Sequence, residues 1–312
     1  MRKLIVLSLF AVLICQSAAP PRIALAQEVK PFPELARMYD YDTKAPLDIK
    51  ENGVEDKEGI KVHDITYLSP KGGRVTAYLV VPPGKGPHAG LVFMHWGFGY
   101  RSSFLAEALL LARSGVVSLM IDAPYNRPAP WRHEFDNSKP EVNRDLYIQM
   151  VVDLRRGVDL LTSRRDVDAK RIGFVGLSLG AHMGGILSGV EKRIKAFVLM
   201  GGLPTITERL RRNNADGKLD HDIEVLSLVD AIHYVNHAKP SSIFFQFARH
   251  DRFISEQQAI QYQQAATEPK LVKYYDTGHE LNDLEALRDR AEWLRKEIGI
   301  GPLAPALRSK LG

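Results

Sequence analysis

The sequence predicts an α/β fold, in which a mostly parallel sheet is covered by helices on both faces. Strand-like apolar runs alternate with helix-like segments along most of the chain, as they do in parallel sheets. Two β-branched segments come first and have the spacing of a hairpin. The chain has 312 residues, 45% of them apolar, which is sufficient for a single large core.

The first two strands are expected at 62–68 and 74–82. Both segments are rich in β-branched residues, and the turn-forming sequence SPKGG separates them. They predict two antiparallel strands at the N-terminal edge of the sheet. The preceding residues, 27–60, are rich in proline and charge, and we expect them to form an extended arm over the surface.

The remaining strands are expected at 89–96, 116–122, 171–177, 194–202, 241–249 and 270–276. Those at 89–96 and 116–122 are continuous apolar runs, so we expect them to be buried on both faces. Helices are expected at 103–115, 144–164, from Ser178 onward, at 256–266 and at 281–299. Residues 203–240 are polar and interrupt the alternation, so they predict a small cap or lid inserted over the sheet.

The two ends of the chain are expected to lie outside the folded domain at 61–300. Residues 1–26 have a basic start, an apolar run from Leu4 to Cys15 and a small-x-small ending, as in a secretory signal peptide. The run is shorter than the roughly 20 residues that span a bilayer, which disfavours a membrane anchor. A lipid anchor at Cys15 is disfavoured by the bulky Ile14 before it. We therefore expect an exported protein, periplasmic or secreted, with a loose tail at 301–312.

Composition excludes several classes of function. The only cysteine, Cys15, lies in the predicted signal peptide, so the mature chain has no disulfide, no cysteine metal ligand and no cysteine nucleophile. The net charge of +5 falls to +2 without Arg2, Lys3 and Arg22. We accordingly expect no nucleic-acid partner, no metal, no cofactor and no stable membrane insertion; the oligomeric state is not predicted.

The sequence GLSLG, residues 176–180, is the strongest candidate for a catalytic motif. It has the pattern G-x-S-x-G, and a predicted strand precedes it while a small-residue helix follows it. A sharp strand-to-helix turn exposes the serine hydroxyl and places it at a helix N-terminus. Ser178 is therefore the predicted nucleophile rather than an ordinary turn residue.

A serine nucleophile needs a histidine base, and the base needs an orienting acid. Asp251 follows the strand at 241–249 and His279 follows the strand at 270–276, so both stand at strand carboxyl ends. Their order after Ser178 is the one this architecture uses. Asp276 and His250 are weaker candidates, because the first closes the same strand and the second adjoins Asp251.

The oxyanion of an acyl-transfer intermediate needs two preorganised N–H donors. One is expected from Leu179, directly after the nucleophile. The second is expected from Gly97 in the loop HWGFGYR, with Trp96 and Phe98 as near alternatives. His95 in the same loop is expected to brace it.

The stretch 74–285 resembles the α/β-hydrolase family. The segments GPHAGLVFMHWGFG, GLSLG, ARHDRFIS and TGHE are similar to its dienelactone-hydrolase-like and prolyl-oligopeptidase-like branches. The resemblance implies an eight-stranded sheet and a Ser178–His279–Asp251 triad. The chain departs from the family where it has His-Trp-Gly in place of His-Gly, and where a serine replaces the cysteine of dienelactone hydrolases.

Carboxylic-ester hydrolysis through an acyl-enzyme is the leading hypothesis for function. An exopeptidase or amidase, with Glu134 or Asp136 holding a substrate amine, is the alternative; a non-catalytic binding protein is a third. The substrate is expected to be a small-molecule ester or amide. The predicted substrate-binding residues are aromatic: Trp96, Phe98, Tyr100, Tyr125 and Trp131.

Overall fold

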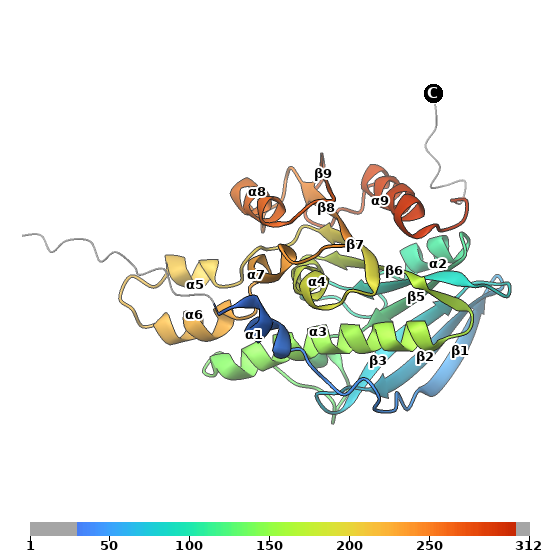
Figure 1. Ribbon diagram of the computed structural model, residues 1–312, viewed down its shortest axis with the longest axis horizontal. Helices are drawn as coiled ribbons and strands as arrows, with labels where there is room; N and C mark the ends of the chain where they lie inside the picture. The colour runs from blue at the N-terminus through green and yellow to red at the C-terminus, as the bar shows by residue number, and fades with distance from the viewer. Residues whose placement is uncertain (1–29, 304–312) are drawn as a thin grey trace, which may run out of the picture.

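A computed structural model describes residues 30–303 of the chain. Its centre is a single sheet with the strand order β1-β2-β3-β5-β4-β6-β7-β8-β9 (Figure 1). The predicted signal peptide at 1–26 and most of the predicted tail at 301–312 lie outside the described residues. Within them, no helix is long and apolar enough to cross a membrane.

All strands except the first overlap the expected runs, although the strand expected at 171–177 begins earlier, at Val167. Their bounds are β1 Lys50–Lys57, β2 Ile60–Leu68, β3 Arg74–Val81, β4 His88–Met94, β5 Val116–Ile121, β6 Val167–Leu177, β7 Ile194–Met200, β8 Ser242–Ala248 and β9 Lys270–Tyr275. The helices are α1 Phe32–Arg37, α2 Leu105–Ala112, α3 Pro140–Ser163, α4 Leu179–Val190, α5 Glu208–Arg212, α6 Asp220–Ser227, α7 Ile232–Val235, α8 Glu256–Ala265 and α9 Leu284–Ile298.

The sheet has nine strands, so the expected number of eight is wrong by one. The additional strand is β1, which lies within the segment expected to be an arm and pairs antiparallel with β2. Its sequence, KENGVEDK, has no apolar alternation, and nearly all of its residues are exposed. An edge strand that buries neither face needs only backbone pairing, and charged residues protect such an edge from aggregation.

The sheet has an antiparallel part and a parallel part, which meet at β5. β1, β2, β3 and β5 pair antiparallel in succession, whereas β5, β4, β6, β7, β8 and β9 are parallel neighbours. Helices α2 and α9 cover one face, and α3, α4 and α8 pack on the other (Figure 1). The expected α/β class is therefore confirmed, and the carboxyl ends of the parallel strands meet at one edge.

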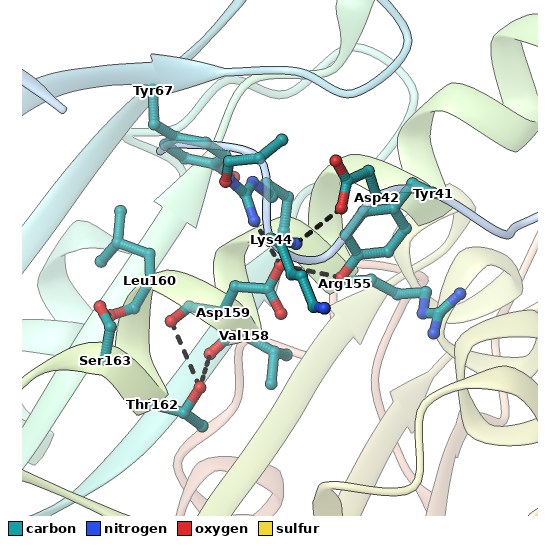
Figure 2. A network of polar contacts seen from close by, with 12 residues as sticks. Tyr41, Asp42, Lys44, Tyr67, Arg155, Val158, Asp159, Leu160, Thr162 and Ser163 are labelled. Carbon is teal, nitrogen blue, oxygen red and sulfur yellow. Dashed lines mark hydrogen bonds and ion pairs between the residues drawn. The ribbon is translucent and has the colours of Figure 1, made fainter. Parts of the chain in front are cut away.

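Polar contacts hold the segment before β1 against α3. The Tyr41 hydroxyl donates to Asp159 Oδ2 at 2.9 Å (Figure 2). Arg155 Nη1 donates to the Tyr39 carbonyl at 2.7 Å. Asp159 also accepts from Arg156 at 2.8 Å and from Arg193 at 2.6 Å. These contacts anchor residues 39–41 on the helix layer of the domain.

Candidate active site

Ser178 occupies a sharp turn between β6 and α4. Its backbone has φ 56° and ψ −112°, in the left-handed region that residues with a side chain rarely adopt. Its N–H donates to the Met200 carbonyl at 2.8 Å, which ties the turn to the end of β7. The side chain is half-buried. The turn thus places the hydroxyl at the carboxyl edge of the sheet.

The two glycines of the motif allow α4 to begin close to the sheet. A Cβ at Gly180 would collide with the Met94 carbonyl at the end of β4, and one at Gly176 would collide with the Gly180 carbonyl. The N-terminus of α4 is therefore packed directly against the strand ends. This explains the G-x-S-x-G pattern as a requirement for space on both sides of the serine.

His279 and Asp251 form a buried pair in the loops after β9 and β8. His279 Nδ1 lies 2.7 Å from Asp251 Oδ2, and the two side chains are 11% and 3% exposed. The other carboxylate oxygen accepts from the backbone N–H groups of Phe253 and Ile254, at 2.8 and 2.9 Å. The Asp251 carboxylate is therefore held in one orientation, and His279 Nε2 has no hydrogen-bond partner among residues 30–303.

The pKa of Asp251 lies below its ordinary value of 3.8. Burial acts to raise this pKa, but the hydrogen bond from His279 and the two backbone N–H donors together outweigh it. The Asp251 carboxyl is therefore ionised throughout the neutral range, as an orienting acid must be.

Gly201 connects the serine to this pair. It follows Met200, whose carbonyl accepts the Ser178 N–H, and a Cβ on it would lie 3.3 Å from His279 Cε1 and 3.5 Å from Asp251 Oδ2. The structure therefore brings all three predicted residues to the same end of β7. Among residues 30–303, no hydrogen bond joins Ser178 Oγ to His279, so the complete triad remains a prediction.

Gly201→Ala is expected to lower kcat/KM by about 100-fold, because an error of about 1 Å in catalytic geometry has this effect. Gly201 has φ +53°, so alanine is strained there and also presses on the His279 ring. Gly59→Ala is the matched control, since Gly59 also has positive φ (+85°) but has nothing within 4 Å of an added Cβ. It should cost about 1–2 kcal/mol of stability and leave kcat/KM unchanged. Equal losses of activity in both variants would contradict this account.

Asp251 should contribute stability that disappears in acid. Because its pKa is lowered on folding, the contribution is present above the ordinary value of 3.8 and is lost as the pH falls through the folded value. The difference in unfolding free energy between wild type and Asp251→Asn should therefore narrow below about pH 4. Denaturant unfolding between pH 3 and 7 measures this difference in unfolding free energy. Asp276→Asn is the control, because the Asp276 side chain is 83% exposed. A difference that widens in acid would contradict the assignment.

The predicted oxyanion donors both have unused N–H groups. Neither Leu179 N–H, at the start of α4, nor Gly97 N–H donates to any residue in the part of the chain that the structure describes. A Cβ at Gly97 would have nothing within 4 Å, so this residue borders open space. Free backbone donors beside the nucleophile are what an oxyanion requires.

His95 braces the loop that carries Gly97. Its Nε2 accepts from Ala123 N–H at 3.2 Å, so its Nδ1 carries the proton and donates to the Trp96 carbonyl at 2.6 Å. Burial lowers the pKa of His95, against the hydrogen bond to Trp96, and favours this neutral form. Both ring nitrogens are therefore occupied in holding the loop.

The five aromatic residues expected to bind substrate lie in different surroundings. Tyr100 and Trp131 line a common cavity. Trp96 packs partly buried against the core on the α2 face, and Phe98 is 93% exposed. Tyr125 lies 5.4 Å from Phe135 between ring centroids and packs against the core on the α3 face.

Three further residues at the site have no distinctive sequence signal. Gly201 is one, and Phe253, whose ring is 4.8 Å from that of His279 and 64% exposed, is the second. His182 is the third: its two ring nitrogens lie 2.9 Å from the carbonyls of Leu203 and Val229. His182 is four residues after Ser178, so only the helical spacing could have indicated its place behind the nucleophile. Among the described residues, no group of His, Cys, Asp or Glu side chains is arranged to hold a metal.

The fold is that of the α/β hydrolases, and solved structures with this fold align over most of the chain. An acetyl xylan esterase from Paenibacillus sp. R4 has a TM-score of 0.72 and 21% identity, covering 85% of this chain and 93% of its own. One from Thermoanaerobacterium sp. JW/SL YS485 has a TM-score of 0.72 and 16% identity, covering 86% and 94%. A cold-adapted esterase from an Arctic intertidal metagenomic library has a TM-score of 0.60 and 16% identity, covering 80% and 99%.

Comparison with curated protein sequences finds a relative that matches only part of the chain. The mouse (Mus musculus) acyl-coenzyme A thioesterase 3 is 27% identical over 149 residues, which are 45% of this chain and 31% of the thioesterase. The chain thus matches less than a third of the length of that relative. No protein-family model matches the sequence.

Proposed function

We propose that this protein is a serine hydrolase that cleaves carboxylic esters. The observation that carries the proposal is the buried His279–Asp251 pair, with 2.7 Å between Nδ1 and Oδ2, facing the same strand end as Ser178 in its strained turn. A hydroxyl nucleophile, an oriented base and two free backbone donors are the parts of an acyl-transfer site. The esterases and thioesterase with similar folds or sequences add support.

The chemistry would proceed in two steps. Ser178 Oγ attacks the ester carbonyl while His279 Nε2 takes the hydroxyl proton, and the resulting oxyanion is bound by the N–H groups of Leu179 and Gly97. His279 returns the proton to the departing alcohol as the carbon–oxygen bond breaks. Water then attacks the acyl-enzyme by the same route, which releases the carboxylic acid and restores Ser178.

The ester assignment is favoured over the amidase alternative by the state of two carboxylates. An exopeptidase needs a carboxylate that is free to hold the substrate amine. Glu134 is 72% exposed, and Asp136 already accepts from the Ser138 hydroxyl at 2.6 Å and lies 3.6 Å from Lys139 Nζ. Neither carboxylate is both enclosed by the protein and free to bind a substrate amine.

Turnover of p-nitrophenyl acetate and of alanyl p-nitroanilide by the purified protein tests the ester assignment. The acetate should be hydrolysed, and kcat/KM for the anilide should be lower by about 1,000-fold or more, since the site holds no partner for its amine. Clear turnover of the anilide with none of the acetate would overturn the proposal in favour of an amidase.

The proposal includes a cap at residues 203–240. This segment contains α5, α6 and α7, and His182 of α4 contacts it at Leu203 and Val229. Asp230 joins its two ends, accepting from Ile206 N–H at 2.6 Å and from the Thr207 hydroxyl at 2.5 Å. These contacts support a cap that is anchored directly behind the nucleophile.

Export is also part of the proposal. It rests on the signal-peptide pattern of residues 1–26, which lie outside the described residues. N-terminal sequencing of the protein recovered outside the cytoplasm should begin at Gln27. Recovery of the intact chain from the cytoplasm alone would contradict it.

A further inference from the structure

A cavity of about 550 Å³ lies beside the loop that follows β4, over β3 and the end of β5. Its volume is within the range of small-molecule binding sites. Among the described residues, Ser178, Asp251 and His279 do not line it, so it is separate from the candidate active site. Its lining includes Asn52, Tyr78, Tyr100, Asp122, Asn126 and Trp131.

The lining combines flat apolar surfaces with neutral polar groups. Three of the lining residues, Tyr78, Tyr100 and Trp131, present aromatic rings, and the side chains between them are largely amides and hydroxyls. Trp131 packs over Gly73, where an added Cβ would lie 3.4 Å from its side chain. A ligand with apolar faces and hydroxylated edges matches such a lining, because its faces can stack while its edges form hydrogen bonds. Sugar rings have this shape.

The charged residues that line the cavity, Arg101, Asp122 and Arg132, all have partners within the protein. Arg132 Nε donates to the Arg127 carbonyl at 3.0 Å, and Arg132 Nη1 lies 3.8 Å from Glu134 Oε1. Arg101 donates to both oxygens of Asp64, at 2.9 and 2.8 Å, and its guanidinium lies 4.4 Å above the Tyr78 ring. Asp122 accepts from Arg101 N–H at 2.8 Å and from the Thr76 hydroxyl at 2.6 Å. Since neither carboxylate is left without a partner, the cavity favours a neutral ligand over a charged one.

A β-bulge places Asn52 at the rim of the cavity. The register between β1 and β2 shifts from Glu51 to Gly53, which leaves Asn52 as the extra residue. Its amide nitrogen donates to Asp64 Oδ1 at 3.1 Å, and its amide oxygen accepts from no residue among 30–303. The bulge therefore presents one unused acceptor beside the aromatic rings.

The near side of the cavity, at Asp122 after β5, lies two strands from Ser178 after β6. Tyr100 lies on the same loop as Gly97, and β5 and β6 are separated in the sheet only by β4. Two strand spacings are about 10 Å, which is comparable to the length of two linked sugar rings. We propose that the cavity is a subsite for one ring of a neutral oligosaccharide, whose neighbouring ring presents an ester to Ser178. This inference rests on the proposed ester hydrolysis and names its substrate class.

Binding by a protein that cannot turn over its ligand tests the subsite directly. Ser178→Ala protein is titrated calorimetrically with cellotetraose, xylotetraose and the charged tetragalacturonate. At least one neutral sugar should bind at millimolar concentration and the charged one more weakly. Adding Trp131→Ala should raise Kd about tenfold, the effect of one lost aromatic stack. No binding of either neutral sugar, or equal binding of tetragalacturonate, would overturn the proposal.

Asn52→Ala is the second variant, because it lies on an exposed strand and keeps the test valid if Trp131→Ala does not fold. It should raise Kd about threefold, as expected for one hydrogen bond. Val54→Ala, on the same strand and 51% exposed, is the control and should leave Kd unchanged. Wild-type affinity in both Trp131→Ala and Asn52→Ala would overturn the proposal.

A kinetic comparison separates this inference from the proposed function. In the Trp131→Ala variant on the wild-type background, the ratio of kcat/KM for an acetylated xylotetraose to that for p-nitrophenyl acetate should fall about tenfold. An unchanged ratio overturns the subsite even if both esters are cleaved. If wild type cleaves neither ester, the proposed function fails, and the binding experiment still decides whether the cavity holds sugar.

Discussion

Ser178→Ala should lower kcat/KM for p-nitrophenyl acetate by about 10,000-fold or more while leaving the melting temperature close to that of wild type. The loss is large because the hydroxyl is the proposed attacking group. Stability should change little, because the serine side chain is half-buried in a turn whose hydrogen bonds involve only its backbone. Ester hydrolysis by the purified variants and thermal unfolding measure the two quantities.

The combination with His279→Ala shows whether the two residues act together. Each single variant should lose a similar amount of kcat/KM, and the double variant should lose no more than either. The reason is that Ser178 and His279 act together, so removing one of them already abolishes the contribution of both. Ser227→Ala is the control and should keep full activity, because Ser227 is a half-buried serine on α6 whose hydroxyl donates to the Glu224 carbonyl. Additive losses, or a Ser178→Ala variant that keeps more than about a tenth of wild-type activity, would contradict the proposed roles.

Asp153→Ala should destabilise the protein by about 3–5 kcal/mol, because it leaves a buried cation without its partner. Asp153 and Arg127 are both completely buried, with 2.6 Å between Oδ2 and Nη2. The other two nitrogens of the Arg127 guanidinium, Nε and Nη1, have no partner within residues 30–303, so the pair is the main compensation for the charge. Denaturant unfolding at pH 7 measures the effect.

Two further variants identify the cause of this loss. Asp145→Ala on the same helix removes a carboxylate that is 64% exposed and paired with Arg144, and should change stability by less than about 1 kcal/mol. The double variant Arg127→Met/Asp153→Leu should recover much of the lost stability, since it removes both charges. A double variant less stable than Asp153→Ala would show that lost packing, and not the unpaired charge, is responsible.

Much of the fold could be predicted because most of its strands are buried on both faces. The run at 89–96 becomes β4, which is almost wholly buried, and a continuous apolar run has few other stable positions. β1 carries no such signal, because it buries neither face and pairs with β2 through its backbone and exposed polar side chains. The start of α3 at Pro140 rather than at Arg144 was missed because the first turn of this helix is mostly polar.

Some residues of the candidate site could be predicted from the sequence, and others could not. Asp251 and His279 could be proposed from chain order, because each follows a buried strand whose carboxyl end must reach the same edge of the sheet. Gly201 could not, since its role depends on how closely His279 packs against it. The cavity beside Tyr100 and Trp131 combines residues from distant strands and loops, and no local pattern marks their meeting.

Labelling with a fluorophosphonate probe tests the central claim most directly, because the probe reacts only with an activated serine. The folded wild-type protein should be labelled on the peptide that contains Ser178, as mapped by mass spectrometry, and the Ser178→Ala protein should remain unlabelled. A folded wild-type protein that does not react, or a label on another serine that persists in Ser178→Ala, would contradict the account and favour a binding protein on a hydrolase fold.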